Sequence, residues 1–220
     1  MEKALVIGAS GGIGQALVAE LAQRYDVTAL SRRADGLDVT DEASVAATLG
    51  ALQEPFARII VATGALEIDG HQPERTIKAL EPEAMMAQFR LNTLGPALVL
   101  KHVWRLIPRK SPSVVAVLSA RVGSIGDNKI GGWVSYRTAK AGVNQVVHTA
   151  AIELARTHKQ ACLIALHPGT VATPFTQKYL GRYPSVPPQE AAANLAGVLD
   201  ARRPEDTGQF YDWANTQVPW

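Results

Sequence analysis

The sequence predicts one α/β domain in which helices cover both faces of a mainly parallel sheet of about seven strands. Short apolar runs, typical of strands buried on both faces, alternate along the chain with segments that are apolar at helical spacing. The length of 220 residues suits one domain. A glycine-rich loop joins the first apolar run to the first helical segment. Together these observations predict a single doubly wound, Rossmann-type domain over residues 1–220.

The composition limits the classes of partner. Hydrophobic residues make up 47% of the chain, and 22 basic against 20 acidic residues leave a net charge of only +2. This balance does not indicate a nucleic-acid or membrane partner. Cys162 is the single cysteine, so no intrachain disulfide is possible and a reducing compartment fits. No stretch reaches the about 18 apolar residues of a membrane span, and no signal peptide precedes the first strand, so we expect a cytoplasmic protein.

The first predicted unit is a strand at residues 4–7, a glycine-rich loop at 8–14 and a helix at 15–24. Glycines let the backbone turn sharply and approach a ligand closely, and the free amides at a helix start favour a phosphate. A tight turn without a ligand is the alternative, but a loop between a buried strand and a helix favours nucleotide binding. The candidate cofactor-binding residues of this loop are Gly8, Ser10, Gly11, Gly12, Ile13 and Gly14.

The second predicted strand, residues 26–30, ends in Ser31, Arg32 and Arg33. NAD-binding units usually place a carboxylate here, where it binds the ribose hydroxyls and repels a 2′-phosphate. A hydroxyl and two guanidinium groups would instead bind the 2′-phosphate, so the sequence favours NADP(H) over NAD(H). An exposed basic loop without a ligand is one alternative. NAD(H) as the cofactor is another, because the Asp35 carboxylate lies nearby in sequence.

The alternation continues through the middle of the chain. A short strand is expected at residues 37–41, followed by a helix at 42–52 and a buried strand at 58–62. The polar residues 66–80 show no period and are expected to form a surface loop with a helical start.

One long helix is predicted from residue 85 to beyond residue 102, despite the Gly95-Pro96 pair. Asn92 lies in the middle of its apolar pattern. A polar amide on such a helix either bonds locally or serves a site, and the proline frees a carbonyl and permits a kink.

The next strand, residues 113–118, leads into a polar, glycine-rich loop and a helix that opens with Tyr136 and Lys140. Residues four apart lie on one helical face, so the phenol and the ammonium can share one site. A phenol has a pKa near ~10, and a nearby cation lowers that pKa by favouring the phenolate. The two residues are therefore a candidate acid/base pair, although the same spacing also occurs on ordinary solvated helices.

The last third of the chain supplies two more strands. Residues 161–166 form a buried strand that ends before Pro168-Gly169, a helix follows at 189–200, and residues 208–213 form the last strand. The sequence contains no repeat, linker or metal-ligand cluster, so no metal is expected.

The order and spacing of these motifs resemble those of the short-chain dehydrogenase/reductase family. The resemblance covers essentially the whole chain. The loop that begins at Ser119 and the ending at Trp220 further resemble the sniffer-like carbonyl reductases and the C-factor group. The residues that carry the family resemblance are Gly8-x-x-x-Gly12-Ile13-Gly14, Asp38, Asn92, Tyr136-x-x-x-Lys140 and Pro168-Gly169-x-Val171-x-Thr173.

This resemblance implies an NADP(H)-dependent oxidoreductase whose cofactor lies across the carboxyl ends of the strands. It implies that Tyr136 protonates a substrate carbonyl as hydride arrives, and that Lys140 binds the nicotinamide ribose and lowers the pKa of Tyr136. Asn92 would connect Lys140 to solvent through water. The further residues implied beside the cofactor are Asp38, Val39, Ala62, Thr63, Gly64, Pro168, Gly169, Val171 and Thr173.

The chain departs from the family pattern at three places. The family's Asn-Asn-Ala-Gly is replaced by Val61-Ala62-Thr63-Gly64. Ala120 stands where the catalytic serine is expected, so Ser119, Ser124 or neither supplies the hydroxyl. The substrate lid at residues 174–188 is short, which predicts an open pocket and loose substrate choice.

Two functions follow. The first is a carbonyl reductase or alcohol dehydrogenase with a small-molecule substrate. The second is an NADP(H)-binding signalling or regulatory protein with weak or no catalysis, for which Ala120 and the missing Asn-Asn are the motives. The amphipathic helices at 85–106 and 136–155 predict a homodimer or homotetramer, although the same apolar stripes can pack on the sheet.

Overall fold

The computed structural model describes residues 1–173, 176–179 and 184–220. Its centre is a sheet of six strands, all parallel, in the order β2-β1-β3-β4-β5-β6. The order reverses at β1, which pairs with both β2 and β3, and open α/β sheets bind ligands at the carboxyl ends beside such a point. The strands are β1 (Lys3–Ile7), β2 (Asp26–Leu30), β3 (Arg58–Val61), β4 (Ser113–Leu118), β5 (Ala161–His167) and β6 (Phe210–Asp212).

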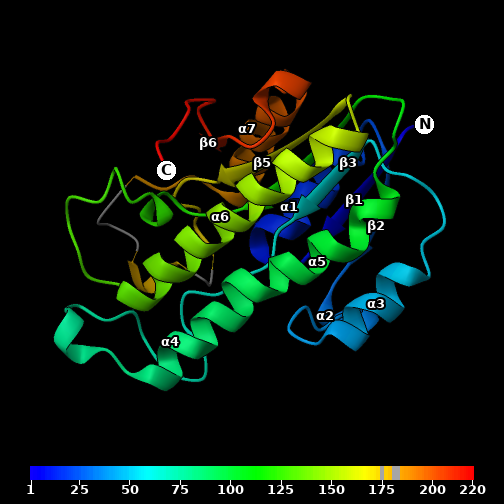
Figure 1. The fold of residues 1–220 in the computed structure, drawn as a ribbon. Helices are drawn as coiled ribbons and strands as arrows, with labels where there is room; N and C mark the ends of the chain where they lie inside the picture. The colour runs from blue at the N-terminus through cyan, green and yellow to red at the C-terminus, as the bar shows by residue number, and fades with distance from the viewer. Residues whose placement is uncertain (174–175, 180–183) are drawn as a thin grey trace.

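Helices cover both faces of this sheet, and Figure 1 shows α6 beside α5 on one face with α1 and α7 on the other. The α-helices are α1 (Gly12–Leu21), α2 (Arg32–Asp35), α3 (Glu42–Gly50), α4 (Pro82–Phe89), α5 (Gly95–Val103), α6 (Val134–Thr157) and α7 (Pro188–Ala201). A π-helical turn, Arg90–Leu94, joins α4 to α5. Short 3-10 turns lie at Ile77–Ala79, Trp104–Leu106, Arg121–Gly123, Gln177–Tyr179 and Pro204–Asp206.

The two faces of the sheet form two hydrophobic cores. Along β1, Leu5 and Ile7 face the core shared with α3, α5 and α6, whereas Ala4 and Val6 face the core shared with α1 and α7. Side chains of a strand alternate between faces, so a strand covered on both sides is apolar at every position. This explains why β1, β4 and β5 were visible as continuous apolar runs.

The sheet has six strands in the described chain, not about seven, because residues 37–41 do not form a strand. The Asp38 carboxylate accepts hydrogen bonds from the backbone N–H of Thr40 at 2.9 Å and from its hydroxyl at 2.7 Å. The Ser44 hydroxyl donates to the Gly36 carbonyl and accepts from the Asp38 N–H, both at 3.0 Å. Side chains thus satisfy backbone groups that a strand would have paired.

The long helix predicted from residue 85 begins at Pro82 and is divided by the π turn rather than kinked at Pro96. Proline is tolerated in the first turn of a helix, and Pro96 is the second residue of α5. The predicted lid, 174–188, lies partly outside the described residues. Its described parts contain the turn Gln177–Tyr179 and a bridge between Val186 and Val171. In the described ranges we find no helix with the length and apolarity that a membrane crossing requires.

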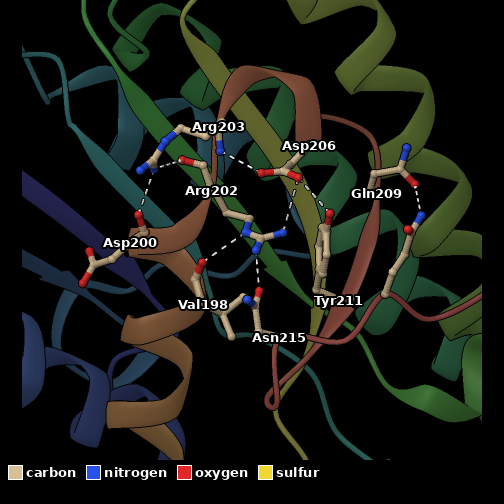
Figure 2. Close-up of polar contacts among 9 residues, drawn as sticks. Val198, Asp200, Arg202, Arg203, Asp206, Gln209, Tyr211 and Asn215 are labelled. Atoms are coloured by element: carbon tan, nitrogen blue, oxygen red, sulfur yellow. Dashed lines mark hydrogen bonds and ion pairs between the residues drawn. The ribbon is translucent and has the colours of Figure 1, made fainter.

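A polar network fixes the C-terminal edge of the sheet (Figure 2). The Arg202 guanidinium stacks 3.8 Å from the ring centre of Tyr211, donates to the Val198 carbonyl at 3.1 Å and bonds Asn215. The Tyr211 hydroxyl donates to Asp206 at 2.9 Å. These contacts join the end of α7 to β6 and to the turn after it, which carries Trp213 towards the site described next.

Candidate active site

A cavity of about 180 Å³ opens at the carboxyl ends of β1, β3, β4 and β5. A larger cavity of about 540 Å³ lies near the opposite ends of the strands, and basic side chains line it. There the Arg105 guanidinium donates to the carbonyls of Leu49, Gly50 and Leu52 at 2.6–2.9 Å, so this basic group already serves a helix end. The smaller cavity brings together titratable side chains and the glycine loop. Its lining includes Gly12, Thr63, Ser119, Tyr136, Lys140, His167 and Thr173.

The glycine loop forms one wall. Gly8 has φ +92°, and a Cβ at Gly14 would lie 2.2 Å from the Gly8 carbonyl oxygen, so this tight turn requires glycine. A Cβ at Gly12 would lie 2.6 Å from Cγ2 of Thr173, so the segment after β5 also lies directly on the loop. Gly12 and Ile13 begin α1, and the first amides of a helix lack intrahelical acceptors. The arrangement is a narrow cradle beside a helix start, which fits a phosphate group.

The residues after β2 begin a short helix instead of a loop. Ser31 is the N-cap of α2, and its hydroxyl accepts the Ala34 N–H at 3.1 Å. The Asp35 carboxylate accepts the Ser31 N–H at 2.7 Å. Arg32 and Arg33 are exposed in the first turn of α2, at the edge of the crevice beside β1. Both guanidinium groups are therefore accessible to an anion, whereas the Ser31 hydroxyl caps the helix.

Asp38 and Val39 follow this helix. The hydrogen bonds from Thr40 hold the pKa of the Asp38 carboxyl below its usual value. Val39 is buried against α5, where a Cβ at Gly95 would lie 3.0 Å from its Cγ2. Neither residue belongs to the lining of the 180 Å³ cavity.

Tyr136 and Lys140 lie on the buried face of α6, with only 6% and 3% of their surface exposed. The Lys140 Nζ lies 5.9 Å from the centre of the Tyr136 ring and donates to the Leu118 carbonyl at 3.1 Å. Burial raises the pKa of the Tyr136 phenol and lowers the pKa of the Lys140 ammonium to about 8. From the sequence the cation is expected to lower the pKa of Tyr136, but burial dominates at this distance.

Asn92 supports the other side of the cavity from the π turn. Its Oδ1 accepts the Ala65 N–H at 3.2 Å, and its Nδ2 donates to the Ala65 carbonyl at 2.9 Å and to Oε1 of Gln88 at 2.6 Å. Gln88 in turn donates to the Leu66 carbonyl at 2.8 Å. A Cβ at Gly64 would lie 2.6 Å from the Asn92 Oδ1 and 3.4 Å from the Lys140 Nζ. Glycine thus allows the amide and the ammonium to approach the loop after β3.

Gln88 was missed in the sequence, although its spacing offered a signal. It lies four residues before Asn92, hence on the same helical face, and it is buried. Thr63, in the loop after β3, lines the cavity. Its hydroxyl oxygen is buried and has no hydrogen-bond partner among the described residues. An orphaned buried hydroxyl in a cavity wall is suited to a bound ligand's polar group.

The two candidate serines have different surroundings. Ser119 lines the cavity, and its hydroxyl donates to Asn144 Oδ1 at 2.6 Å. The Ser124 hydroxyl instead donates to the Pro219 carbonyl at 2.5 Å and accepts the Asp127 N–H at 3.1 Å, and Ser124 is not part of the cavity lining. Ser124 therefore anchors the C-terminal tail to the loop. Ala120 lines the cavity at the expected serine position.

The segment after β5 closes the cavity. Gly169 has φ +78°, and a Cβ there would lie 2.8 Å from Cδ1 of Trp213, so the backbone packs closely on the indole ring. Val171 and Thr173 are buried, and both line the cavity with Pro168. His167 also lines it, and burial lowers the pKa of its imidazole to about 4, so the ring is neutral at pH 7. His167 is a site residue that the sequence motifs did not predict.

Comparisons with known proteins found similar chains. Residues 4–210 match the family model described as Enoyl-(Acyl carrier protein) reductase. Over the full length of both chains the protein is 32% identical to the 1-hydroxy-2-glutathionyl-2-methyl-3-butene dehydrogenase of Rhodococcus sp. strain AD45. It is 30% identical to the C-signal of Myxococcus xanthus over 62% of this chain and 78% of that protein, which supports the resemblance to the C-factor group.

A solved structure shares the fold across the whole chain. The NADPH-bound carbonyl reductase from chicken fatty liver superposes with a TM-score of 0.83 at 23% identity, covering 100% of this chain and 99% of that one. The match over residues 4–210 and the full-length relative at 32% identity show that the chain belongs to the short-chain dehydrogenase/reductase family of oxidoreductases.

Proposed function

We propose that this protein transfers a hydride between NADP(H) and a carbonyl or alcohol substrate, with Tyr136 as the acid/base. One observation carries the proposal: Tyr136, Lys140 and the glycine loop line the same cavity at the carboxyl edge of the sheet. A phenol and an ammonium in one buried wall form a proton-transfer site, and the loop opposite them forms a phosphate cradle.

The residues present fit a dinucleotide. Glycine at positions 8, 11, 12 and 14 leaves much of the loop backbone without side chains, so a pyrophosphate could approach it closely. Arg32 and Arg33 are exposed at the end of β2 and would bind a 2′-phosphate. The Thr63 hydroxyl and the segment from Pro168 to Thr173 would hold the nicotinamide side. The bound nicotinamide would supply the hydride for reduction and accept it for oxidation.

The chain itself would manage the proton. Tyr136 is protonated at neutral pH, because burial raises the pKa of its phenol, so it would donate its proton to a carbonyl oxygen. Lys140 would bind a ribose hydroxyl and stabilise the phenolate left on Tyr136. Asn92 is bonded to Ala65 and Gln88, so its direct role would be to fix the loop after β3, next to the Lys140 ammonium. Ser119 would offer substrate an oxygen lone pair, since its proton is bonded to Asn144.

The printed names of the comparison proteins support the reaction class and the cofactor. The Rhodococcus relative is named a dehydrogenase, and the chicken structure is named an NADPH-bound carbonyl reductase. We extend these to the present chain as a proposal, with a small-molecule carbonyl or alcohol as substrate.

The direct test is NADPH consumption by the purified protein with a panel of aldehydes, ketones and quinones. We expect turnover with at least one class and its loss in Tyr136→Phe, which keeps the ring and removes the hydroxyl. Lys140→Met should also abolish turnover. Equal inactivity of the wild type and Tyr136→Phe across the whole panel would remove the main support for the proposal.

A second candidate is an NADP(H)-binding signalling or regulatory protein. It is favoured by the similarity to the Myxococcus C-signal and by Ala120 at the expected serine position. Calorimetry would separate the two functions: tight NADPH binding without turnover on the panel favours the regulatory protein.

We further propose that the protein is a homodimer or homotetramer. Met86 and Phe89 on α4, Leu94 in the π turn and Ile152 on α6 are apolar side chains exposed by 40–66%. Their position on the outer surface of the paired helices supports an interface there. Analytical ultracentrifugation of the wild type and of Phe89→Glu would test it.

A further inference from the structure

We propose that Glu74 is a positioning residue for Tyr136: its carboxylate clamps the first turn of α6, the helix that presents the phenol to the cavity. Glu74 lies in the loop between β3 and α4, 61 positions before Ser135 in sequence, and it is buried with 7% of its surface exposed. The inference rests on the proposed function of Tyr136, and it adds a residue that lies outside the cavity lining.

The start of α6 lacks a side-chain cap of its own. Trp133 is the N-cap residue and makes no side-chain cap hydrogen bond to the helix. Its backbone is left-handed, with φ 53° and ψ 40°, which is uncommon for a bulky residue and requires support from its surroundings. Gly131 and Gly132 before it are also left-handed, with φ +69° and +67°. The chain therefore enters the helix through three consecutive residues with left-handed backbone conformation.

Glu74 supplies the missing support from another part of the chain. Its carboxylate accepts the Ser135 backbone N–H at 3.2 Å and the Ser135 hydroxyl, and its backbone carbonyl accepts the Trp133 N–H at 2.5 Å. A Cβ at Gly132 would lie 3.3 Å from the Arg75 carbonyl oxygen, so the turn packs directly on the backbone beside Glu74. A carboxylate at a helix N-terminus also stabilises the helix through its dipole.

The clamp bears directly on the phenol. Tyr136 follows Ser135 in the chain, and its ring meets the Trp133 ring edge-on at 6.3 Å between centres. Glu74 therefore holds Trp133, the N-cap of α6, and Ser135, the residue directly before Tyr136. Proton transfer requires the phenol oxygen within hydrogen-bond reach of the substrate oxygen, and a displacement of ~1 Å can cost about 100-fold in rate.

Hydrogen bonding rather than charge is the feature that holds the turn. Glutamine in place of Glu74 keeps an oxygen that accepts the Ser135 N–H, and the Ser135 hydroxyl can turn to accept from the glutamine amide. Alanine removes both contacts and leaves a buried N–H unpaired. The pair of variants therefore separates the loss of the clamp from the loss of a negative charge.

The test measures kcat, the affinity for NADPH and thermal unfolding for Glu74→Ala and Glu74→Gln. Glu83→Ala is the matched control, because Glu83 is an exposed carboxylate in the first turn of α4. We expect Glu74→Ala to lower kcat by about tenfold or more while NADPH affinity stays within about twofold, and Glu74→Gln to recover most of the rate. A kcat for Glu74→Ala within twofold of the wild type overturns the proposal, as does a Glu74→Gln variant no faster than Glu74→Ala.

A second measurement does not depend on turnover. Amide hydrogen exchange of residues 135–140 should be faster in Glu74→Ala than in the wild type and in Glu83→Ala, because the first turn of α6 has lost its clamp. Unchanged exchange there overturns the proposal even if the protein has no activity on any carbonyl. Activity that is lost in Tyr136→Phe and intact in Glu74→Ala would leave the proposed function standing and remove only the clamp.

Discussion

The Ser119 hydroxyl donates to Asn144 Oδ1 at 2.6 Å, and Asn144 lies one helical turn beyond Lys140 on α6. Of the two candidate serines, Ser119 is the one that lines the cavity. Its hydroxyl hydrogen thus points into the protein. The Asn144 Nδ2 is buried without a hydrogen-bond partner among the described residues. Ser119 therefore connects β4 to α6 behind the cavity wall.

This bond leads to a prediction about the serines. Ser119→Ala should lower the free energy of unfolding by about 1–3 kcal/mol, because Asn144 Oδ1 loses its donor in a buried place. It should lower kcat by less than about tenfold, whereas removal of a hydroxyl that donates to the substrate oxygen typically costs about 100-fold or more. Ser124→Ala is the control and should leave kcat within about twofold, since its hydroxyl binds Pro219. Urea unfolding and steady-state kinetics measure both quantities.

Lys140 should make the stability of the protein depend on alkaline pH. The native pKa of the ammonium is lowered to about 8 from 10.5, so between these values the unfolded state binds more protons than the native state. Stability therefore rises as pH rises from about 8 to 10.5. Lys140→Met should lose this rise and be more stable than the wild type at pH 7 by on the order of 2 kcal/mol, since no buried charge remains. Denaturant unfolding at several pH values measures this dependence. The same slope of unfolding free energy against pH in both proteins would contradict the prediction.

The activity should fall over the same pH range. Above pH 8 the Lys140 ammonium of the free protein loses its proton and with it the charge that stabilises the phenolate. Tyr136 stays protonated there, because burial raises the pKa of its phenol, so the falling limb belongs to Lys140. We expect kcat/KM for NADPH-dependent reduction to decline as pH rises through about 8. A Lys140→Arg variant keeps its charge and should show no such limb, whatever its absolute rate.

Arg32 and Arg33 should distinguish the two nicotinamide cofactors. Replacing either with alanine should weaken NADPH binding by about 1–3 kcal/mol through the loss of a charge-assisted phosphate contact. NADH binding should change little, because NADH has no 2′-phosphate. Calorimetry with both cofactors measures the difference, and an equal loss for both would mean that neither arginine is a phosphate ligand.

Gln88 should matter for stability although it lies outside the cavity lining. Gln88→Leu keeps the size of the side chain but leaves the Leu66 carbonyl without its donor, and we expect a loss of about 1–3 kcal/mol. Gln145→Leu is the matched control, because Gln145 is exposed on α6 and bonds only Thr149 among the described residues. Equal unfolding midpoints for the two variants would show that the Gln88 contacts contribute nothing.

The sequence was informative wherever burial on two faces left a pattern. Continuous apolar runs predicted β1 and β4, and the four-residue spacing placed Tyr136 and Lys140 on one face of α6. The miscounted strand at 37–41 shows the limit of this reasoning. There, Asp38 and Ser44 bond the backbone locally, and such contacts leave no periodicity in the sequence.

The support of the site was hidden for a related reason. Glu74 bonds Ser135 across 61 positions of sequence, and the Ser124 hydroxyl bonds Pro219 across 95. Neither spacing has a local signature, because the fold alone brings these segments together. Glu74 looked like one more polar residue of a surface loop. Polar residues that act at long range become recognisable only when their burial is known.

The π turn at Arg90–Leu94 has a consequence for the length of the chain. Its wider winding lets two consecutive residues face inward, Asn92 towards Ala65 and Thr93, which donates to the Ala139 carbonyl at 2.7 Å. Removing one residue here would restore an ordinary α-helix with its two flanks nearly in phase, but it would remove one of the two consecutive inward-facing positions. Asn92 and Thr93 would then no longer reach both partners. This stretch should therefore reject single-residue insertions and deletions even where it accepts substitutions. The number of residues in the turn is more strictly constrained than their identity.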